Sequence, residues 1–266
     1  MALTGGELKR YNRQLILREV GEEGQERLRR ARVLVVGAGG LGSPAAYYLA
    51  AAGIGTLGIV DSDRVDLSNL QRQILHRTED LGRPKVESAS RALRALNPLI
   101  EVKTYPIKLT PANAMETIQG YDVVIDAVDN FPARFLLNDA CVLAGIPLVE
   151  GGVLRWEGIM MTVLPRRGAC YRCLFPEPPP AGGVPGAGEV GVMGAIPGVL
   201  GVLQALEAIK LILGVGEGLA GRLLLFDGLT TSFREVAIER DPACPVCGSS
   251  PRITSLGPGY PWEGGD

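Results

Sequence analysis

The sequence predicts an α/β protein with a doubly wound, mainly parallel sheet and an antiparallel C-terminal extension. Two observations carry this prediction. Over the first 150 residues, apolar runs of strand length alternate with helical stretches, which is the pattern of successive strand–helix–strand units. After residue 152 this alternation stops, and short apolar runs follow one another around turn residues, as antiparallel strands do.

The expected elements of the parallel part follow in order. Residues 7–30 predict two polar helices that are broken near Gly21. A helix is expected after Pro84, because proline is favoured where a helix starts. The run 121–127 is apolar nearly throughout, which suits a strand buried on both faces. The expected strands are residues 33–36, 56–60, 100–105, 121–127 and 147–149, and the expected helices are residues 43–52, 85–96, 112–119 and 131–144.

The C-terminal part predicts different elements. Two short strands are expected over residues 153–164, around a turn at Glu157-Gly158. Residues 176–191 are rich in Pro and Gly and predict a long connection, a kind of loop that is usually functional or disordered. The remaining expectations are a helix over residues 196–213, strands over residues 222–226 and 233–238, and a disordered tail over residues 254–266.

Composition and charge exclude several classes of function. The chain has 266 residues, is 46% apolar and has a formal charge of −2, so it lacks the basic surface of a nucleic-acid-binding or membrane-surface protein. Residues 1–10 are polar and lack the apolar stretch of a signal peptide. No apolar run is expected to be long enough to span a bilayer. We therefore predict a cytoplasmic protein with no nucleic-acid partner and no membrane partner.

A glycine-rich turn follows the first predicted strand. Its spacing, G-x-G-x-x-G, falls on Gly37, Gly39 and Gly42. Gly37 is expected to make the tight turn, Gly39 to let the backbone approach a phosphate, and Gly42 to let the helix pack on the strand. The free N–H groups at the start of that helix would then face an anion. This arrangement is typical of a Rossmann-like nucleotide site.

The polar residues after the second strand indicate the kind of nucleotide. Asp61 ends that strand, where an acid accepts hydrogen bonds from ribose hydroxyls; the alternative is a solvated strand-end acid. Ser68 is expected to cap a short helix that places Asn69, Arg72 and Gln73 on one face. An Asn and an Arg together suit a triphosphate, because the guanidinium group is a forked donor for phosphate oxygens.

Three more charged residues follow at the edge of the predicted sheet. Lys85 is one of only five lysines and suggests a compact charge for a phosphate; the alternative is a surface residue in the first turn of its helix. Asp126 and Asp129 follow the fourth strand, at the carboxyl edge where open α/β sheets bind ligands. An acid there can hold Mg²⁺ against phosphate oxygens. Because Asp126 is also placed to cap the chain reversal, Asp129 is the predicted magnesium ligand.

Four of the five cysteines form two C-x-x-C pairs. Such pairs build a closed tetrahedral zinc site, which is structural because no coordination position is left for water. A redox role of either pair is the alternative. The fifth cysteine, Cys141, lies in an apolar helical stretch and is expected to be a small buried hydrophobe. The predicted zinc ligands are Cys170, Cys173, Cys244 and Cys247.

Taken together, these motifs make the chain resemble the ThiF/MoeB family of ubiquitin-activating-like adenylyltransferases, which activate ubiquitin-fold sulfur carrier proteins. The resemblance covers residues 8–247. It rests on residues 10–14 (RYNRQ), the glycine-rich turn, residues 61–73, Lys85, residues 126–134 and both cysteine pairs. It implies one adenylation domain over residues 1–253, with N-terminal helices (1–30), a nucleotide-binding half (31–150) and a carrier-binding and zinc half (151–253).

The resemblance also implies cofactors and an assembly. The cofactors are ATP, Mg²⁺ and Zn²⁺, and the assembly is a homodimer with one ATP site per subunit. Arg13 would reach across the dimer to the neighbour's phosphates, although its spacing alone indicates only a charge on a helix surface. The implied contacts are Asp61 with the ribose, Asn69, Arg72 and Lys85 with the phosphates and Asp129 with Mg²⁺, with Gln73, Gly37, Gly39, Gly40 and Gly42 also lining the nucleotide.

The implied reaction is attack of a carrier's C-terminal Gly-Gly carboxylate on the α-phosphate of ATP, which yields an acyl-adenylate and pyrophosphate. Gly40 would leave room beside that phosphate for the carrier's terminus. A carboxylate is already ionised at pH 7 and needs no general base, so the only histidine, His76, is expected to be a loop or core contact. Carriers for thiamin, molybdopterin and thio-tRNA synthesis all fit this chemistry.

The chain departs from the family in one loop. Many members carry a further cysteine there, at a position that falls near Ala187 in this sequence, and residues 176–191 contain none. We therefore predict adenylation without a covalent thioester or persulfide in this loop. A separate enzyme would then donate the sulfur.

Three alternative functions share parts of this pattern. An NAD-dependent oxidoreductase has the glycine-rich turn and the ribose acid, but the cluster of Asn69, Arg72, Lys85 and Asp129 argues against it. A member of the same superfamily that acts on tRNA is disfavoured by the nearly neutral charge and the cysteine pairs. A non-catalytic partner subunit is disfavoured by the complete set of predicted ATP contacts.

Overall fold

The computed structural model describes residues 2–180 and 190–261. The strands in these ranges are β1 (Arg32–Val36), β2 (Thr56–Val60), β3 (Glu101–Tyr105), β4 (Val123–Asp126), β5 (Leu148–Leu154), β6 (Glu157–Val163), β7 (Arg222–Asp227) and β8 (Ser232–Ala237). The α-helices are α1 (Gly5–Arg10), α2 (Asn12–Leu15), α3 (Gly21–Arg30), α4 (Gly42–Ala52), α5 (Lys85–Leu96), α6 (Ala114–Ile118), α7 (Phe131–Ala144), α8 (Tyr171–Leu174) and α10 (Ala195–Leu213). Two 3₁₀ turns, η1 (Leu67–Asn69) and η2 (Thr78–Asp80), lie between β2 and α5.

The strands form one sheet in the order β3-β2-β1-β4-β5-β6-β7-β8. The first five strands of that order pair in parallel, and β6, β7 and β8 continue the sheet antiparallel. The predicted doubly wound sheet with an antiparallel extension is thereby confirmed. Strand order reverses between β1 and β4, which in open α/β sheets is the switch point beside which ligands bind.

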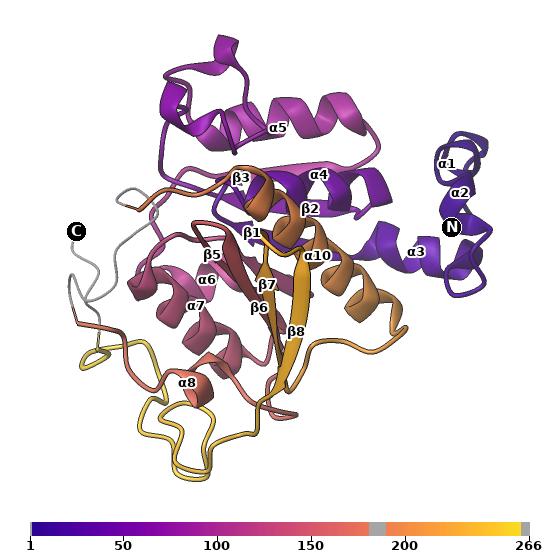
Figure 1. The fold of residues 1–266 in the computed structure, drawn as a ribbon. Coiled ribbons are helices and arrows are strands. Elements are labelled where there is room, and N and C mark those ends of the chain that lie inside the picture. Colours follow the sequence, from indigo (N-terminus) through magenta and orange to yellow (C-terminus); the bar gives the residue numbers. More distant parts are fainter. Residues whose placement is uncertain (1, 181–189, 262–266) are drawn as a thin grey trace.

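The sheet is covered on both faces, and β1 shows why. Val33 and Val35 belong to one apolar core, which the sheet shares with α3, α4, α5 and α10. Leu34 and Val36 point the other way, into a second core formed with α6, α7 and α8. Since side chains alternate along a strand, an unbroken apolar run fills both cores at once. Figure 1 shows the two helical layers on opposite sides of the sheet.

The N-terminal region differs from the prediction, because three short helices replace the expected two. The first break falls at Tyr11, which ends α1 and is almost completely buried. Its hydroxyl accepts a hydrogen bond from the Nδ2 of Asn97 (2.9 Å), and its ring packs where Gly53 has no side chain. The tertiary anchor at Tyr11 therefore interrupts a stretch that is helical in its local pattern.

The turn of the hairpin between β5 and β6 was predicted two residues too late. β5 runs on to Leu154, and the two-residue turn is Arg155-Trp156 rather than Glu157-Gly158. Arg155 adopts a positive φ of 53°, a conformation that is unusual for arginine and typical of tight hairpin turns. Gly158 lies inside β6, where a Cβ would come within 2.9 Å of Leu200 of α10. The glycine serves the packing of α10 on the sheet and not the turn.

Helix α10 corrects the expectation about apolar runs. It is 19 residues long and apolar enough to cross a membrane by length and composition, although no such run was expected. Half of that window is buried within the protein, where it packs on α4 and β5. The helix is thus a core element of this fold.

The C-terminal segment is packed where a disordered tail was predicted. Leu256 is buried in the second core, and the hydroxyl of Tyr260 donates to Oδ2 of Asp139 on α7 (2.8 Å). The tail prediction is therefore wrong for residues 254–261, and residues 262–266 lie outside the described part of the chain. The loop position near Ala187 also lies outside it.

Candidate active site

A cavity of about 830 Å³ opens at the switch point between β1 and β4. One part of its wall is the glycine-rich turn, and the opposite part comes from β5, β6 and α8. The volume is in the range of pockets that hold cofactors and drug-sized ligands. The site residues that line it are Gly37, Gly39, Gly40, Asp61, Arg72, Gln73, Lys85 and Asp129.

The shape of the glycine-rich turn depends on two glycines. Gly37 has a φ of 101°, and a Cβ there would overlap the carbonyl of Ala127 at the end of β4. A Cβ on Gly42 would overlap the carbonyl of Gly37, so this glycine closes the turn on itself and does not only bring the helix onto the strand. At Gly39, by contrast, a Cβ would meet only Nε2 of Gln73 at 3.6 Å, so backbone is presented to the cavity there.

Gly40 lines the cavity and also has a neighbour that the sequence did not predict. A Cβ at this position would lie 3.1 Å from the ring of Pro197 in α10 and 3.5 Å from Cγ of Arg72. The missing side chain therefore allows α10 to approach the turn, in addition to any space it leaves for a ligand.

Asp61 holds the turn from beside it. One carboxylate oxygen accepts from the backbone N–H of Ala38 (2.8 Å), and the other accepts from that of Asp63 (2.8 Å). The carboxylate lies in the cavity wall at the end of β2, where a ribose would meet it.

The segment after β2 is organised differently from the prediction. Asp66, and not Ser68, caps the short helix, and that helix is the 3₁₀ turn η1. Arg72 reaches the cavity wall and donates to the carbonyl of Ser68 (3.1 Å). Asn69 stays outside the wall and bonds to the Ser68 hydroxyl (3.2 Å), so this structure does not bring it together with Arg72 in the cavity.

Gln73 and Lys85 lie deeper in the wall. Gln73 is almost fully buried, and its Oε1 has no hydrogen-bond partner among the described residues. Lys85 is only 5% exposed, and its Nζ lies 2.8 Å from Asp63 and 4.0 Å from Asp61. Lys85 also lines the cavity, so this paired ammonium group lies in the wall that a ligand would meet.

The two acids after β4 have separate positions. Asp126 is completely buried and accepts from the backbone N–H of Val128 (3.0 Å), so it does cap the chain reversal. Asp129 is exposed in the cavity wall, where its carboxylate bonds weakly to Asn130 (3.4 Å). Mg²⁺ is held by one or two carboxylates together with substrate phosphates, so Asp129 has the donor chemistry and the position for it.

A buried ionic cluster beneath the cavity was missed from the sequence. Arg134 of α7 lines the cavity, and its Nε lies 3.1 Å from Glu150 and 3.4 Å from Asp126. Burial raises the pKa of Glu150 to about 7, against the attraction of Arg134. Burial also raises the pKa of Asp126, so this cluster tends to keep a proton. In the sequence, Glu150 comes directly after the apolar run 147–149, much as Asp126 comes at the end of its own run, and this shared position was the available signal.

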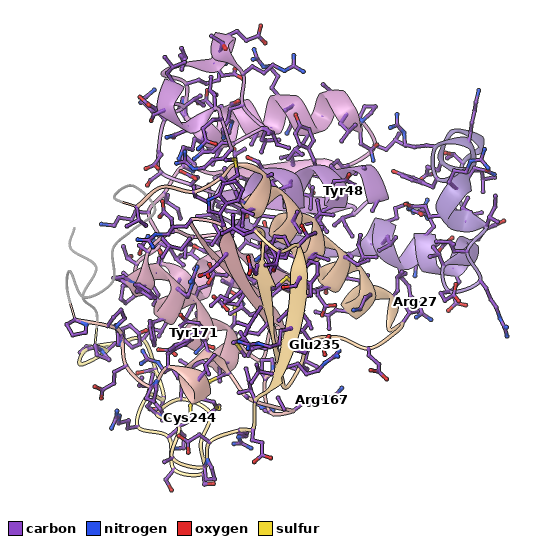
Figure 2. All side chains as sticks on the ribbon, in the orientation of Figure 1. Arg27, Tyr48, Arg167, Tyr171, Glu235 and Cys244 are labelled. Atoms are coloured by element: carbon purple, nitrogen blue, oxygen red, sulfur yellow. The ribbon has the colours of Figure 1, made fainter. Side chains whose placement is uncertain are left out.

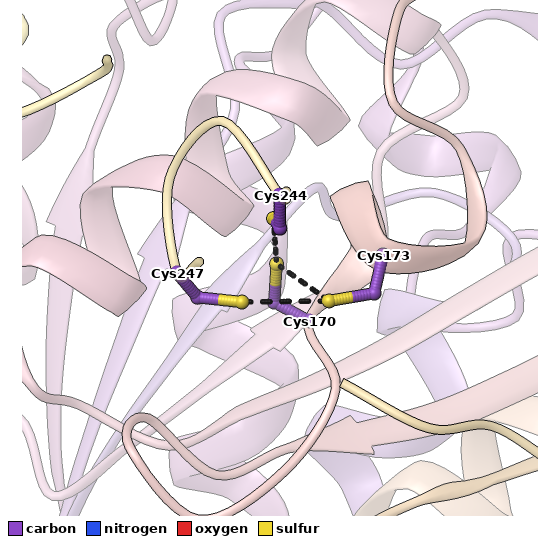
Figure 3. A group of neighbouring side chains, drawn as sticks. All are labelled: Cys170, Cys173, Cys244 and Cys247. Carbon is purple, nitrogen blue, oxygen red and sulfur yellow. Dashed lines mark hydrogen bonds between the residues drawn. The ribbon is translucent and has the colours of Figure 1, made fainter. Parts of the chain in front are cut away.

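The four paired cysteines meet at the second core, and Figure 3 shows their sulfur atoms close together. Their sulfur atoms lie 3.6 Å apart for Cys170 and Cys244, 3.4 Å apart for Cys173 and Cys247, and 4.0 Å apart for Cys170 and Cys173. Tetrahedral zinc with Zn–S bonds of 2.3 Å requires sulfur separations of about 3.8 Å. The geometry and the all-thiol donor set therefore fit a structural zinc ion. Tyr171 and Cys244, both labelled in Figure 2, belong to the second core.

The cysteine site is tied to the cavity by its own neighbours. Arg172, between the first two cysteines, donates to both carboxylate oxygens of Asp139 on α7 (2.8–2.9 Å). Tyr171 and Phe175, on either side of it, line the cavity. Bidentate pairs of this kind fix the orientation of both partners. Metal binding would therefore stabilise one wall of the cavity without contacting its ligand.

Three further predictions concern residues away from the cavity wall. His76 is buried, as expected of a core contact, and so is Cys141. Burial raises the pKa of the Cys141 thiol, which keeps it protonated and unreactive. Arg13 is exposed on α2 and does not line the cavity of its own chain.

Fold and site together define a nucleotide-binding α/β protein with a four-cysteine structural site. The ThiF family matches residues 11–246, and the chain belongs to the ThiF family. It is 54% identical to the sulfur carrier protein adenylyltransferase of Thermus thermophilus over 261 residues, which are 96% of each chain. It is 51% identical to the SAMP-activating enzyme E1 of Haloferax volcanii over 248 residues, 93% of this chain and 92% of that one.

Solved structures show the same fold at lower identity. The structure of E. coli MccB with succinimide superimposes with a TM-score of 0.79 over 90% of this chain and 74% of that one, at 24% identity. This similarity supports the architecture of the sheet and its helices.

Proposed function

We propose that the protein uses ATP to adenylate the C-terminal carboxylate of a ubiquitin-like sulfur carrier protein. One observation carries the proposal: in a chain 54% identical to a sulfur carrier protein adenylyltransferase, Asp61, Arg72, Lys85 and Asp129 converge around one glycine-rich turn. The products are a carrier acyl-adenylate and pyrophosphate. Attack by a carboxylate requires positioning and neutralisation of charge, which these residues offer, and no general base.

The roles of the charged residues follow from their positions. Arg72 and Lys85 face the turn and would neutralise the triphosphate, while Asp61 would accept from the ribose. Asp129 would hold Mg²⁺, which neutralises phosphate charge when it is bound. Gln73 offers an unpaired oxygen to the same space, and Asn69 would have to turn inward to contribute.

The far part of the cavity suits the end of a carrier chain. Its wall there includes Gly152 and Gly158, together with apolar side chains of β5, β6 and α8. A Gly-Gly terminus has no side chains and fits a narrow path between such walls. The carrier would thus enter from the antiparallel side of the sheet and meet the nucleotide at the switch point.

We further propose a homodimer in which Arg13 of one subunit contacts the nucleotide of the other. Arg13 is exposed on the N-terminal helices and lies outside its own cavity, which is the position that a residue acting between subunits requires. The lack of a cysteine in residues 176–191 supports transfer without an enzyme-bound thioester there, with sulfur from a separate donor enzyme.

The test is ATP–pyrophosphate exchange with each ubiquitin-fold protein of the source organism that ends in Gly-Gly. Exchange is expected with at least one carrier, and it should require Mg²⁺ and the carrier's terminal glycine. Exchange without any carrier, or with none of them, would contradict the proposal. A matched carrier without its last glycine is the control for the acceptor.

A further inference from the structure

His76, the only histidine, contacts the glycine-rich turn at a single point. Its Nε2 lies 2.9 Å from the carbonyl oxygen of Ala38. The N–H of the same residue donates to Asp61 (2.8 Å), so the peptide groups on either side of Ala38 are each held by a side chain. Ala38 is fully buried between Gly37 and Gly39, the residues whose backbone forms the turn. A shift of that carbonyl would move the neighbouring N–H groups with it.

The other side of the ring faces a buried chain of polar groups. Nδ1 of His76 lies 2.9 Å from the hydroxyl of Ser88, which lies 2.8 Å from Oδ2 of Asp80. All three residues are at least 95% buried. Arg83 and Arg91 contact the other oxygen of Asp80. Although burial opposes its charge, the bond from Ser88 and these guanidinium groups hold the pKa of Asp80 below its usual value.

The protons shared by His76, Ser88 and Asp80 can be counted. A carbonyl oxygen only accepts, so the contact with Ala38 requires a proton on Nε2. Ser88 has one hydroxyl proton, which it can give either to Asp80 or to Nδ1 of His76. Burial lowers the pKa of His76, and Lys85 acts in the same direction, against the Ala38 carbonyl, Asp61 and Asp80. In this structure that hydroxyl proton goes to Asp80, so the proton on Nε2 is required by the Ala38 carbonyl alone.

We propose that His76 is a positioning residue for the nucleotide: by donating from Nε2 to the Ala38 carbonyl, it holds the glycine-rich turn in the shape that presents N–H groups to phosphate. The carbonyl oxygen, which can only accept, selects the ring state with a proton on Nε2. The proposal rests on the proposed function in that it takes the ligand of the turn to be ATP. It assigns His76 no contact with the reacting atoms.

Two substitutions separate this role from simple packing. In H76Q the side-chain amide N–H can replace Nε2, whereas in H76N the amide reaches only as far as Nδ1. We expect H76N to raise the KM for ATP in pyrophosphate exchange by about tenfold and to change kcat by less than about threefold, because a lost hydrogen bond leaves the turn less ordered before binding. H76Q should stay within about threefold of the wild type in both constants.

A second readout does not depend on nucleotide. Because the chain has one histidine, the ¹⁵N spectrum of its imidazole in the untagged protein reports His76 alone. The expected state at pH 7 is a protonated Nε2, and S88A should keep it because the Ala38 carbonyl stays in place. A proton on Nδ1 alone, or equal KM values in H76N and H76Q, would overturn the inference; if H76N fails to fold, the spectrum and the S88A variant decide.

The two proposals fail in different ways. If the wild type neither binds ATP nor catalyses exchange, the proposed function is wrong, and the tautomer of His76 is still measured by the spectrum. If the wild type is active and the tautomer is the opposite one, only the role of His76 is wrong.

Discussion

The two halves of the molecule build their sites in opposite ways. In the nucleotide-binding half, backbone and charged side chains that range from buried (Lys85) to exposed (Asp129) line an open cavity. In the zinc half, four thiols from segments 74 residues apart close around a point within 4.8 Å of one another. An open site can exchange its ligand, whereas a closed site with every donor used holds a metal permanently. The first is built for turnover and the second for structure.

The buried cluster of Asp126, Arg134 and Glu150 lies where the two halves meet. β4 belongs to the first half, and β5 leads into the second. Two carboxylates share one guanidinium there, and they do so out of contact with water. Removing Arg134 would leave two buried carboxylates without a counter-charge, which makes this junction sensitive to substitution of the guanidinium.

The largest expected effect tests whether the zinc half is structural. Cys244→Ser should remove the metal and lower the free energy of unfolding by on the order of 4–5 kcal/mol, because a closed metal site is coupled to folding. The measurement is zinc content by elemental analysis together with chemical denaturation. Cys141→Ala is the control, and it should keep one zinc per chain. If the Cys244→Ser protein keeps normal stability and a normal zinc content, the four-cysteine site is not the structural site that distinguishes this half.

The next effect tests whether the open half serves chemistry. Arg72→Ala and Asp129→Ala should each lower carrier-dependent exchange by about 10²–10³-fold, the cost of removing a preorganised charge at a reacting phosphate. Thermal stability should change little, since Asp129 is exposed and Arg72 is only half-buried. Arg77→Ala, an exposed arginine outside the cavity, is the matched control. Full exchange in either variant would exclude that residue from the site.

The buried cluster of Asp126, Arg134 and Glu150 should make the stability of the protein depend on pH. Glu150 has a pKa of about 7 in the folded protein, raised by burial from its ordinary value of 4.5. The folded state then binds the extra proton, so stability falls as pH rises from about 4.5 to about 7. Glu150→Gln removes this titration and should make the protein more stable than the wild type at pH 8, by up to about 3 kcal/mol.

Denaturation at pH 5 and pH 8 measures this difference. Glu217→Gln, on an exposed glutamate, should leave the pH profile unchanged. A parallel profile for Glu150→Gln and the wild type would mean that Glu150 stays ionised in the folded protein over this range.

The smallest effect concerns the contact of α10 with the glycine-rich turn. Gly40→Ala would place a methyl group 3.1 Å from Pro197 and should cost about 1 kcal/mol of stability, with more for Gly40→Val. Expressed as free energies, the loss of exchange activity should be larger than the loss of stability, because displacing α10 also displaces the glycine-rich turn. Gly198→Ala, one residue after Pro197, meets nothing within 4 Å and should stabilise α10 slightly. If substitution of Gly40 lowers stability and exchange by the same free energy, the role of Gly40 is packing alone.

Local patterns were reliable where the chain makes a structure from neighbouring residues. The turn at Gly37–Gly42, the strand β2 and the helices α5 and α7 were predicted to within a residue or two, because each carries its own start and stop signals. The hairpin at Arg155 and the break at Tyr11 were not. Each is decided by a contact with a distant element, Leu200 for Gly158 and Asn97 for Tyr11.

By itself, the sequence determined the class of fold, the edge of the sheet at which the site lies, and the cysteines that form the second site. These follow from periodicity, glycine spacing and ligand spacing, all of which are local or pairwise. Only the tertiary structure decided that Asn69 lies outside the cavity, that Glu150 shares Arg134 with Asp126, and that His76 reaches the Ala38 carbonyl. Burial and hydrogen-bond partners depend on segments far apart in the chain, and no spacing rule encodes which of them will meet.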